Sequence, residues 1–256
     1  NRIREPFIRE DETLRVATLD EAINAFVSKV NKLRNDSSQQ IAFIASPVLT
    51  NEELYLVKKL ADFLDIGNVF SNAIEWSGEK KFGLISPDPF PNSSGVRDMG
   101  LATDSGIKRM MELILEDKLK ALYVIGEDLF KLVRDEEREK LSKALSRLSL
   151  LTVQDFKLTE TVKLAHIILP GASPYEKDGT FTNDQGRIQR IRAAIPPPGN
   201  ARPDWEILAL IGQRFDQRSF NYTHPSQIML EISDRFPVYK GIDYDKIGIL
   251  GIKKPQ

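Results

Sequence analysis

The sequence of 256 residues contains no cysteine. This absence excludes disulfides, thiolate-held iron–sulfur clusters, cysteine-ligated zinc and thiol nucleophiles within this chain. The two histidines, His166 and His224, are too few for a histidine-rich metal site and make a histidine-centred catalytic triad hard to build. His166 lies in an apolar run, so we expect it to pack beside a strand. His224 precedes a proline, which predicts a helix-capping or surface role.

Long apolar runs and strong net charge are also missing. No apolar stretch approaches the roughly 20 residues of a membrane span, and the charged opening, residues 1–16, predicts no secretory leader. The formal net charge of −1 argues against nucleic acid or an anionic membrane as a partner. Glycine is absent from the apolar run 41–47 and occurs once in 120–128, so neither carries a dinucleotide fingerprint or a P-loop.

Helical and strand patterns alternate along most of the chain. Helical periodicity or capping signals predict helices over 18–34, 50–65, 104–118, 134–149, 159–165, 204–215 and 224–236. Short apolar runs predict strands over 41–47, 68–71, 120–128, 150–156 and 166–171. Thr18 or Asp20, Thr50, Thr159 and Asp204 are the expected N-caps, and Glu53 completes a capping box with Thr50. Residues 179–194 predict a hairpin around Asp-Gln-Gly.

This alternation predicts an α/β fold with a doubly wound, mostly parallel sheet and Rossmann-like helix–strand order, followed by a hairpin and helices. We expect a first α/β half over 1–72, an irregular connection over 73–103 and a second half over 104–215. The remainder, 216–256, should hold a helix and then an extended tail beyond residue 237. Within the connection, the Asn-Ser-Ser-Gly run at 92–95 suits a turn.

Candidate ligand-binding residues follow the predicted strand 150–156. Asp155, Thr159, Glu160 and Thr161 lie where the strand ends and a helix begins. Doubly wound sheets bind ligands beyond the carboxyl ends of their strands, which favours a binding role. The alternative is that Thr159 caps the helix and Asp155 caps the strand end.

The segment 176–187, EKDGTFTNDQGR, concentrates polar side chains between two apolar runs. We expect Gly179 and Gly186 to adopt positive φ in turns. Thr180 and Asn183 are expected to bond to the backbone of the crossing segment. The segment therefore either grips a ligand or holds the chain together.

Two carboxylate pairs offer general acid–base chemistry, Glu127 with Asp128 and Glu176 with Asp178. Nothing in the sequence places a second group opposite either pair, so acidic residues at strand ends are the simpler interpretation. Arg187 is expected to form an ion pair with Glu176 or Asp178 and so hold the hairpin to the strand edge.

With these residues in view, the segment 153–189 resembles the signature of molybdopterin-dependent oxidoreductases. In that family a strand ends in aspartate, a Thr-Glu-Thr helix follows, and an apolar strand precedes E-x-x-G-T-x-x-N-x-E-G-R. Here His166 stands for the usual aspartate and Gln185 for the usual glutamate. The openings RIREPFIR and TLDEAI are also similar to the family pattern, with Leu19 in place of tryptophan.

Within that superfamily, NSSGVRDMGL at 92–101 resembles the large iron–sulfur subunit of NADH–quinone oxidoreductase, respiratory complex I. The resemblance implies a non-catalytic molybdopterin-like structural domain, or a fragment of one, that supports electron transfer as a scaffold. It implies no cofactor in this chain and no metal ligand. It further implies docking to other subunits of a respiratory or related complex, peripheral to the cytoplasmic or matrix side of an energy-transducing membrane.

The resemblance leaves an alternative, a pterin-nucleotide-binding oxidoreductase domain of a molybdoenzyme. The cofactor would then be molybdopterin guanine dinucleotide, and its contacts are implied to be Asp155, Thr159, Glu160, Gly179, Thr180, Asn183 and Arg187. A third possibility, outside the family, is a doubly wound domain that binds a small anionic ligand at its strand ends. The lack of a glycine-rich loop makes this third possibility the weakest.

Overall fold

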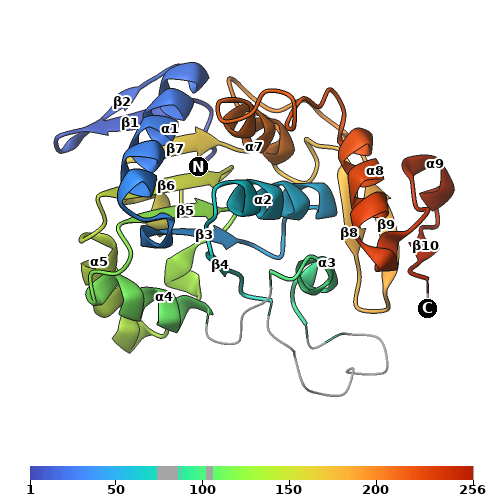
Figure 1. Ribbon diagram of the computed structural model, residues 1–256, viewed down its shortest axis with the longest axis horizontal. Helices are drawn as coiled ribbons and strands as arrows, with labels where there is room; N and C mark the ends of the chain where they lie inside the picture. Colours follow the sequence, from blue (N-terminus) through green and yellow to red (C-terminus); the bar gives the residue numbers. More distant parts are fainter. Residues whose placement is uncertain (74–85, 87, 102–105, 256) are drawn as a thin grey trace.

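The computed structural model describes residues 1–73, 86, 88–101 and 106–255. Within them one sheet has strands β1 (Phe7–Glu10), β2 (Thr13–Val16), β3 (Ile41–Ala45), β4 (Asn68–Phe70), β5 (Ala121–Ile125), β6 (Leu150–Asp155) and β7 (Ile167–Pro170). Their order is β2-β1-β7-β6-β5-β3-β4 (Figure 1). The strands from β7 to β4 pair in parallel, and the β1–β2 hairpin joins β7 antiparallel. The predicted α/β fold with a mostly parallel sheet is therefore confirmed.

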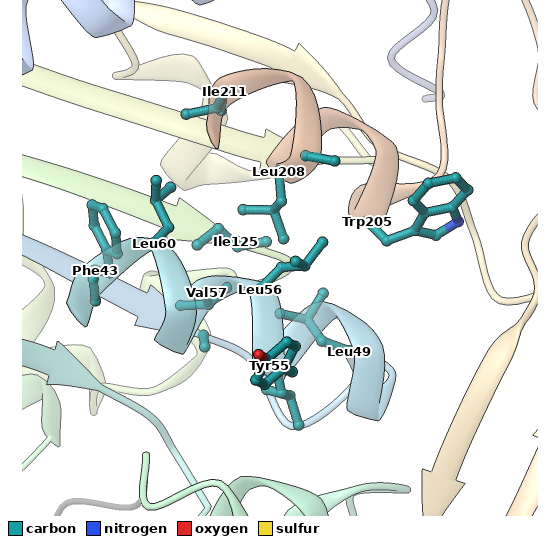
Figure 2. Packing of buried hydrophobic residues seen from close by; sticks show 14 of the residues in the cluster. Phe43, Leu49, Tyr55, Leu56, Val57, Leu60, Ile125, Trp205, Leu208 and Ile211 are labelled. Carbon is teal, nitrogen blue, oxygen red and sulfur yellow. The ribbon is translucent and has the colours of Figure 1, made fainter. Parts of the chain in front are cut away.

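Helices cover both faces of this sheet. The helices of the described residues are α1 (Leu19–Asp36), α2 (Asn51–Phe63), α3 (Ser93–Asp98), α4 (Gly106–Leu115), α5 (Arg138–Leu145), α6 (Glu160–Lys163), α7 (Asp204–Gln213), α8 (Pro225–Arg235) and α9 (Tyr244–Ile247). On one face α1, α2 and α7 pack over side chains such as Phe43, with α8 packed against α2 beside them. On the other face α4, α5 and α6 pack against strand side chains such as Ile44. Figure 2 shows Leu56 of α2 directed toward Leu208 of α7 over the strands. Both faces are therefore buried, as a parallel sheet requires.

Most helix starts match their local sequence signals. Thr18 and Thr50 close capping boxes with Glu21 and Glu53, and His224 accepts a hydrogen bond from the Ser226 N–H at the start of α8. The prediction for Asp204 is wrong, because Pro203 is the N-cap of α7 and Asp204 is its first residue. The carboxylate of Asp204 instead accepts hydrogen bonds from the side chains of Gln154 and Lys177.

The Asn-Ser-Ser-Gly run forms no free-standing turn. Asn92 precedes α3, and Ser93, Ser94 and Gly95 lie in its first turn. A Cβ on Gly95 would lie 2.2 Å from Oδ1 of Asn51 in α2, so the glycine permits close packing between these helices. Residues 74–85, 87 and 102–105 of the predicted connection, and the first residues of the predicted helix 104–118, lie outside the described residues.

A second sheet stands beside the first. Its described strands, β8 (Gly179–Thr182), β9 (Arg187–Ile191) and β10 (Ile252–Lys253), are antiparallel in the order β10-β9-β8 (Figure 1). The predicted hairpin around Asp-Gln-Gly is thus confirmed. The predicted extended tail beyond 237 is wrong, because α9 and β10 fold back onto the hairpin with Tyr239, Tyr244 and Ile247 buried. The predicted boundaries between the two α/β halves stay a prediction.

Candidate functional site

A cavity of about 270 Å³ opens at the carboxyl edge of the parallel strands. Its wall combines residues that end or follow β3, β5, β6 and β7 with one residue of α7. They are Val48, Leu49, Gly126, Glu127, Asp128, Lys131, Asp155, Phe156, Lys157, Thr159, Ala172, Pro174, Lys177 and Asp204. This is the edge at which doubly wound sheets bind ligands.

The register of the strands brings these residues together. Ile125 of β5 pairs with Gln154 of β6, and Asp155 pairs with Pro170 of β7, so the three strands end at one level. Gly126 follows β5 with φ of +68°, a conformation that glycine adopts at little cost. The chain therefore turns sharply after β5 and delivers Glu127 to the cavity wall.

Two carboxyl groups of the wall are buried and perturbed. Glu127 accepts from the Ser46 hydroxyl at 3.0 Å and from the Asp128 N–H at 3.1 Å, and burial raises its pKa to about 7. Burial likewise raises the pKa of Asp155 to about 6, even though its Oδ1 accepts from the Lys157 N–H at 2.9 Å. Both groups therefore exchange protons near neutral pH, and each can accept or donate a hydrogen bond to a ligand.

The helix α6 is tied to the loop after β5. The Thr161 hydroxyl donates to Oδ1 of Asp128 at 2.9 Å and accepts from the Leu129 N–H at 2.8 Å. Thr159 lines the cavity and also caps α6, accepting from the Val162 N–H at 3.3 Å. The capping role that the sequence offered as the alternative for Thr159 is therefore present in the structure.

Lys177 is a buried cation that sequence reasoning missed. Its side chain is 3% exposed, and its ammonium donates to Oε2 of Glu53 at 2.8 Å and to Oδ2 of Asp204 at 2.7 Å. We call these three residues the buried triad. Burial alone would lower the pKa of Lys177, but the two carboxylates outweigh it and raise that pKa above its usual value. The pKa of Glu53 is also raised, first by burial.

The buried triad is anchored to the sheet through Asp204. Oδ1 of Asp204 accepts from Nε2 of Gln154 in β6 at 2.8 Å, and Gln154 in turn accepts from the Tyr123 hydroxyl. A Cβ on Gly171 would lie 2.4 Å from the same Oδ1, so the glycine after β7 leaves room for this carboxylate. Oε1 of Glu53 has no hydrogen-bond partner among the described residues.

A second polar cluster joins the first turn of α2 to the hairpin. We call it the α2–hairpin network; its members are Asn51, Glu52, Asn92, Thr180, Thr182, Tyr239 and Tyr244. Glu52 accepts from the N–H of Thr180 at 2.8 Å, from its hydroxyl at 3.0 Å and from the Tyr244 hydroxyl at 2.9 Å. Burial raises the pKa of Glu52 to about 7. These contacts use the polar groups of β8 within the fold.

Gly179 lies beside the α2–hairpin network, and its role differs from the predicted turn. Its φ is not positive, so the expectation of a turn conformation is wrong. A Cβ there would lie 2.5 Å from Cγ2 of Thr50. The glycine therefore lets β8 pack against the start of α2. Gly186 does adopt a positive φ of +69°, as predicted.

The predicted ion pair of Arg187 is wrong. Its guanidinium donates to the carbonyl oxygen of Gly251 at 3.1 Å, next to β10. Glu176 instead pairs with Arg2 at 2.7 Å, and Asp178 lies 3.8 Å from Arg190. The folded tail supplies acceptors for Arg187 that an extended tail would not.

The predicted cofactor contacts thus separate into groups. Asp155 and Thr159 line the cavity. Glu160 faces the surface and pairs with Arg138 at 2.6 Å. Asn183 closes the hairpin turn, where its Oδ1 accepts from the N–H groups of Gln185 and Arg187. Gly179 and Thr180 pack at the start of α2, as above. The charged cavity residues that were not predicted as contacts are Glu127, Asp128, Lys131, Lys157, Lys177 and Asp204.

The described residues contain neither a cluster of metal-ligating side chains nor a membrane-spanning helix. Across the described ranges, 1–73, 86, 88–101 and 106–255, no group of three or more His, Asp or Glu residues could hold a metal ion. No helix in that part of the chain is long and apolar enough to cross a bilayer.

Comparison with known families adds one match. The model of the family described as molybdopterin oxidoreductase matches residues 68–214. This range contains β4 through α7 and therefore most of the cavity wall.

Known proteins with similar sequences bear related names. A protein of Staphylococcus haemolyticus provisionally named formate dehydrogenase is 43% identical over 139 residues, 54% of this chain and 14% of that protein. F420-dependent formate dehydrogenase 2 subunit alpha of Methanococcus maripaludis is 38% identical over 160 residues, 62% of this chain and 23% of that protein. The alpha subunit of the F420-dependent enzyme of Methanocaldococcus jannaschii is 39% identical over 182 residues, 66% of this chain and 27% of that protein.

The chain therefore spans between 14% and 27% of the length of these relatives. Among solved structures, acetylene hydratase from Pelobacter acetylenicus aligns over 87% of this chain and 27% of that chain, with a TM-score of 0.46 and 11% sequence identity.

Proposed function

Because this chain belongs to the molybdopterin oxidoreductase family, we propose that it binds the nucleotide end of a pterin dinucleotide cofactor in a formate dehydrogenase-like alpha subunit. The proposed binding site is the cavity at the carboxyl edge of the parallel sheet. The observation that carries the proposal is the pair of buried carboxyl groups there, Asp155 and Glu127.

Two observations favour this molybdoenzyme domain over the complex I scaffold. The relatives named above are formate dehydrogenases. A pure scaffold is also expected to fill its strand ends with side chains, whereas a cavity of about 270 Å³ remains between them. Since two of these relatives are named as alpha subunits, we further propose that the chain works in a complex with other subunits. A location beside a membrane stays a prediction.

The residues of the cavity fit a nucleotide by their arrangement of charge. Inside, Asp155 is 5% and Glu127 is 8% exposed, and their oxygens accept from the ring N–H and amino groups of a base such as guanine. Toward solvent, Lys131 and Lys157 have exposed side chains that attract phosphate. A base would therefore lie inside and its phosphates at the mouth.

The size of the cavity limits what this chain holds. Ligand pockets commonly measure roughly 300–1,000 Å³, so the cavity of about 270 Å³ suits a base rather than a whole dinucleotide. The rest of the cofactor would contact parts of the subunit that this chain does not include. When bound, the cofactor supplies the redox-active metal, and the residues here bind and orient its nucleotide.

We narrow the proposed contacts accordingly. Asp155 accepts hydrogen bonds from the base, and Thr159 shapes the wall beside it. Glu160, Gly179, Thr180, Asn183 and Arg187 act on the fold, since each contacts protein groups away from the cavity wall.

The test is a calorimetric titration of the 256-residue chain with guanosine monophosphate at neutral pH. We expect saturable binding that weakens at least ~10-fold in Asp155→Asn, because a hydrogen bond to a charged group contributes about 1.5–3 kcal/mol. Glu160→Gln is the matched control and should bind as the wild type does. Absence of binding to the wild-type chain, or equal loss in both variants, would overturn the proposal.

A further inference from the structure

Lys177 holds a buried donor that the fold does not use in full. An ammonium carries three N–H groups, and Lys177 directs two hydrogen bonds, to Glu53 and to Asp204. The residue also forms part of the cavity wall. Within the described residues, one N–H of this ammonium therefore has no partner, on a side chain that is 3% exposed.

The charges around Lys177 restrict the group that this N–H can meet. Glu53 and Asp204 contact it directly, and Asp155 and Glu127 share the same cavity. A further buried anion would meet these acidic groups at short range, which is unfavourable in a poorly solvated site. A neutral carbonyl oxygen accepts the N–H without adding charge.

Building on the proposed function, we infer that Lys177 is a specificity-determining residue, whose third N–H donates to a ring carbonyl of the bound base. The wall then offers a donor from Lys177 and acceptors from Asp155 and Glu127. A lactam edge, a carbonyl next to a ring N–H, is complementary to that pattern. A 6-aminopurine has an amino group in place of the carbonyl and a ring nitrogen without hydrogen in place of the ring N–H. The N–H of Lys177 would then face the N–H of the amino group, and neither could accept a hydrogen bond.

The cost of such a mismatch sets the selectivity. A site built to hydrogen-bond a polar group rejects an analogue that lacks it, because its own buried donor is left unpaired. The amino group of guanine is a separate feature, read by the carboxylates. Inosine monophosphate keeps the lactam edge and lacks that amino group, so it separates the role of Lys177 from that of Asp155.

The experiment compares guanosine, inosine and adenosine monophosphates on wild type and two variants. Lys177→Met alone leaves two buried carboxylates without a cation, so the test variant is Lys177→Met with Glu53→Gln. This pair keeps the net charge of the buried triad and removes the donor. Glu53→Gln alone is the control, and glutamine also serves in a capping box. Thermal melts verify that both variants fold.

We expect wild type and control to bind guanosine and inosine monophosphates at least ~10-fold more tightly than adenosine monophosphate. In the double variant this ratio should fall several-fold, since no donor remains to read the carbonyl, and the preference that is left comes from the ring N–H that Asp155 and Glu127 read. If wild type binds guanosine monophosphate and the double variant keeps the ratio, the inference about Lys177 is wrong and the proposed function stands. If Glu53→Gln alone loses the preference for guanosine and inosine monophosphates over adenosine monophosphate, the inference is also wrong. If wild type binds none of the three, both fail.

Discussion

Glu52 in the α2–hairpin network and Glu127 in the cavity wall are carboxyl groups with the same pKa of about 7 and the same main cause, burial. Their surroundings differ. Glu52 is fully buried and accepts three hydrogen bonds from β8 and α9, whereas Glu127 accepts two from neighbouring loops and lines open space. A perturbed pKa alone therefore does not identify a site; the space beside the group does.

The buried triad connects these two regions. Glu53 follows Glu52 in the first turn of α2, and Lys177 precedes the hairpin strand β8 while forming part of the cavity wall. The polar density of residues 176–187 thus has two uses. Lys177 at its start faces the cavity, and the residues after it hold the hairpin to α2.

Removing Lys177, the cation of the buried triad that links the two regions, should have the largest effect on stability. Lys177→Met leaves Glu53 and Asp204 buried without a counter-charge, which should cost about 3–5 kcal/mol of unfolding free energy. Lys157→Met at the cavity mouth is the control and should cost less than about 0.5 kcal/mol. Urea unfolding measures both. A loss below about 1 kcal/mol in Lys177→Met would mean that the triad adds little to the fold.

The second prediction separates the titration of the two regions. The pKa of Glu52 is raised from 4.5 to about 7, so its folded form binds a proton more tightly than the unfolded chain does. Its contribution to stability is therefore fully present below about pH 4.5 and is lost as pH rises through about 7. In Glu52→Gln, the decrease in unfolding free energy over this pH range should be smaller by about 3 kcal/mol.

Unfolding free energies measured across this pH range provide the check. Glu127→Gln should also flatten the curve, because the pKa of Glu127 is raised in the same direction. The two variants should differ once guanosine monophosphate is added. The ligand should alter the pH dependence less in Glu127→Gln than in Glu52→Gln, because Glu127 lines the cavity and Glu52 does not, while Asp155 is intact in both variants. An equal ligand effect in the two variants would contradict the separation of the two regions.

Sequence patterns predicted what is local in this structure. Apolar runs predicted the buried strands, and Thr50 with Glu53 predicted the capping box, because both signals lie within a few residues. The partner of Glu53 could not be found this way, since Lys177 is 124 residues distant in sequence. The carboxylate of Asp204 was assigned to a helix cap because no sequence rule reveals Gln154 and Lys177 beside it.

The candidate site shows the same limit. Asp155 and Thr159 were found because they follow a strand at the ligand-binding edge. Gly179 and Thr180 belong to the same sequence motif but pack against α2, and only the fold separates them from the cavity. The sequence did contain a signal for Glu127. It follows Gly126 just after a predicted strand, and Asp155 was found because it lies at the end of the next strand.

The third prediction tests how closely β8 approaches α2. Gly179→Ala places a methyl group 2.5 Å from Cγ2 of Thr50 and should cost about 1–3 kcal/mol. Gly106→Ala, whose nearest neighbour would lie 3.4 Å away, is the control and should be close to neutral. Adding Thr50→Ser removes the closest atom and should restore part of the loss in denaturant unfolding. No loss in Gly179→Ala would show that the hairpin shifts freely on α2.

The fourth and smallest effect concerns the folded tail. Tyr244→Phe removes the hydroxyl that donates to Oε1 of Glu52 at 2.9 Å, at a cost of about 1–2 kcal/mol. Because that donor stabilises the carboxylate, its loss should also raise the pKa of Glu52 further. The phenol of Tyr175, which is 73% exposed, provides the control Tyr175→Phe, expected to change neither quantity.

Carbon-detected NMR titration of the glutamate carboxyls measures the pKa of Glu52 directly. A change in the pKa of Glu52 in Tyr244→Phe, without a change in the pKa of Glu127, would mean that the tail acts on the α2–hairpin network alone. Binding of guanosine monophosphate should then be unchanged, because Tyr244 is absent from the cavity wall. If binding weakened with the tail variant, the α2–hairpin network would have to be coupled to the cavity, and the buried triad is the path by which α2 reaches it.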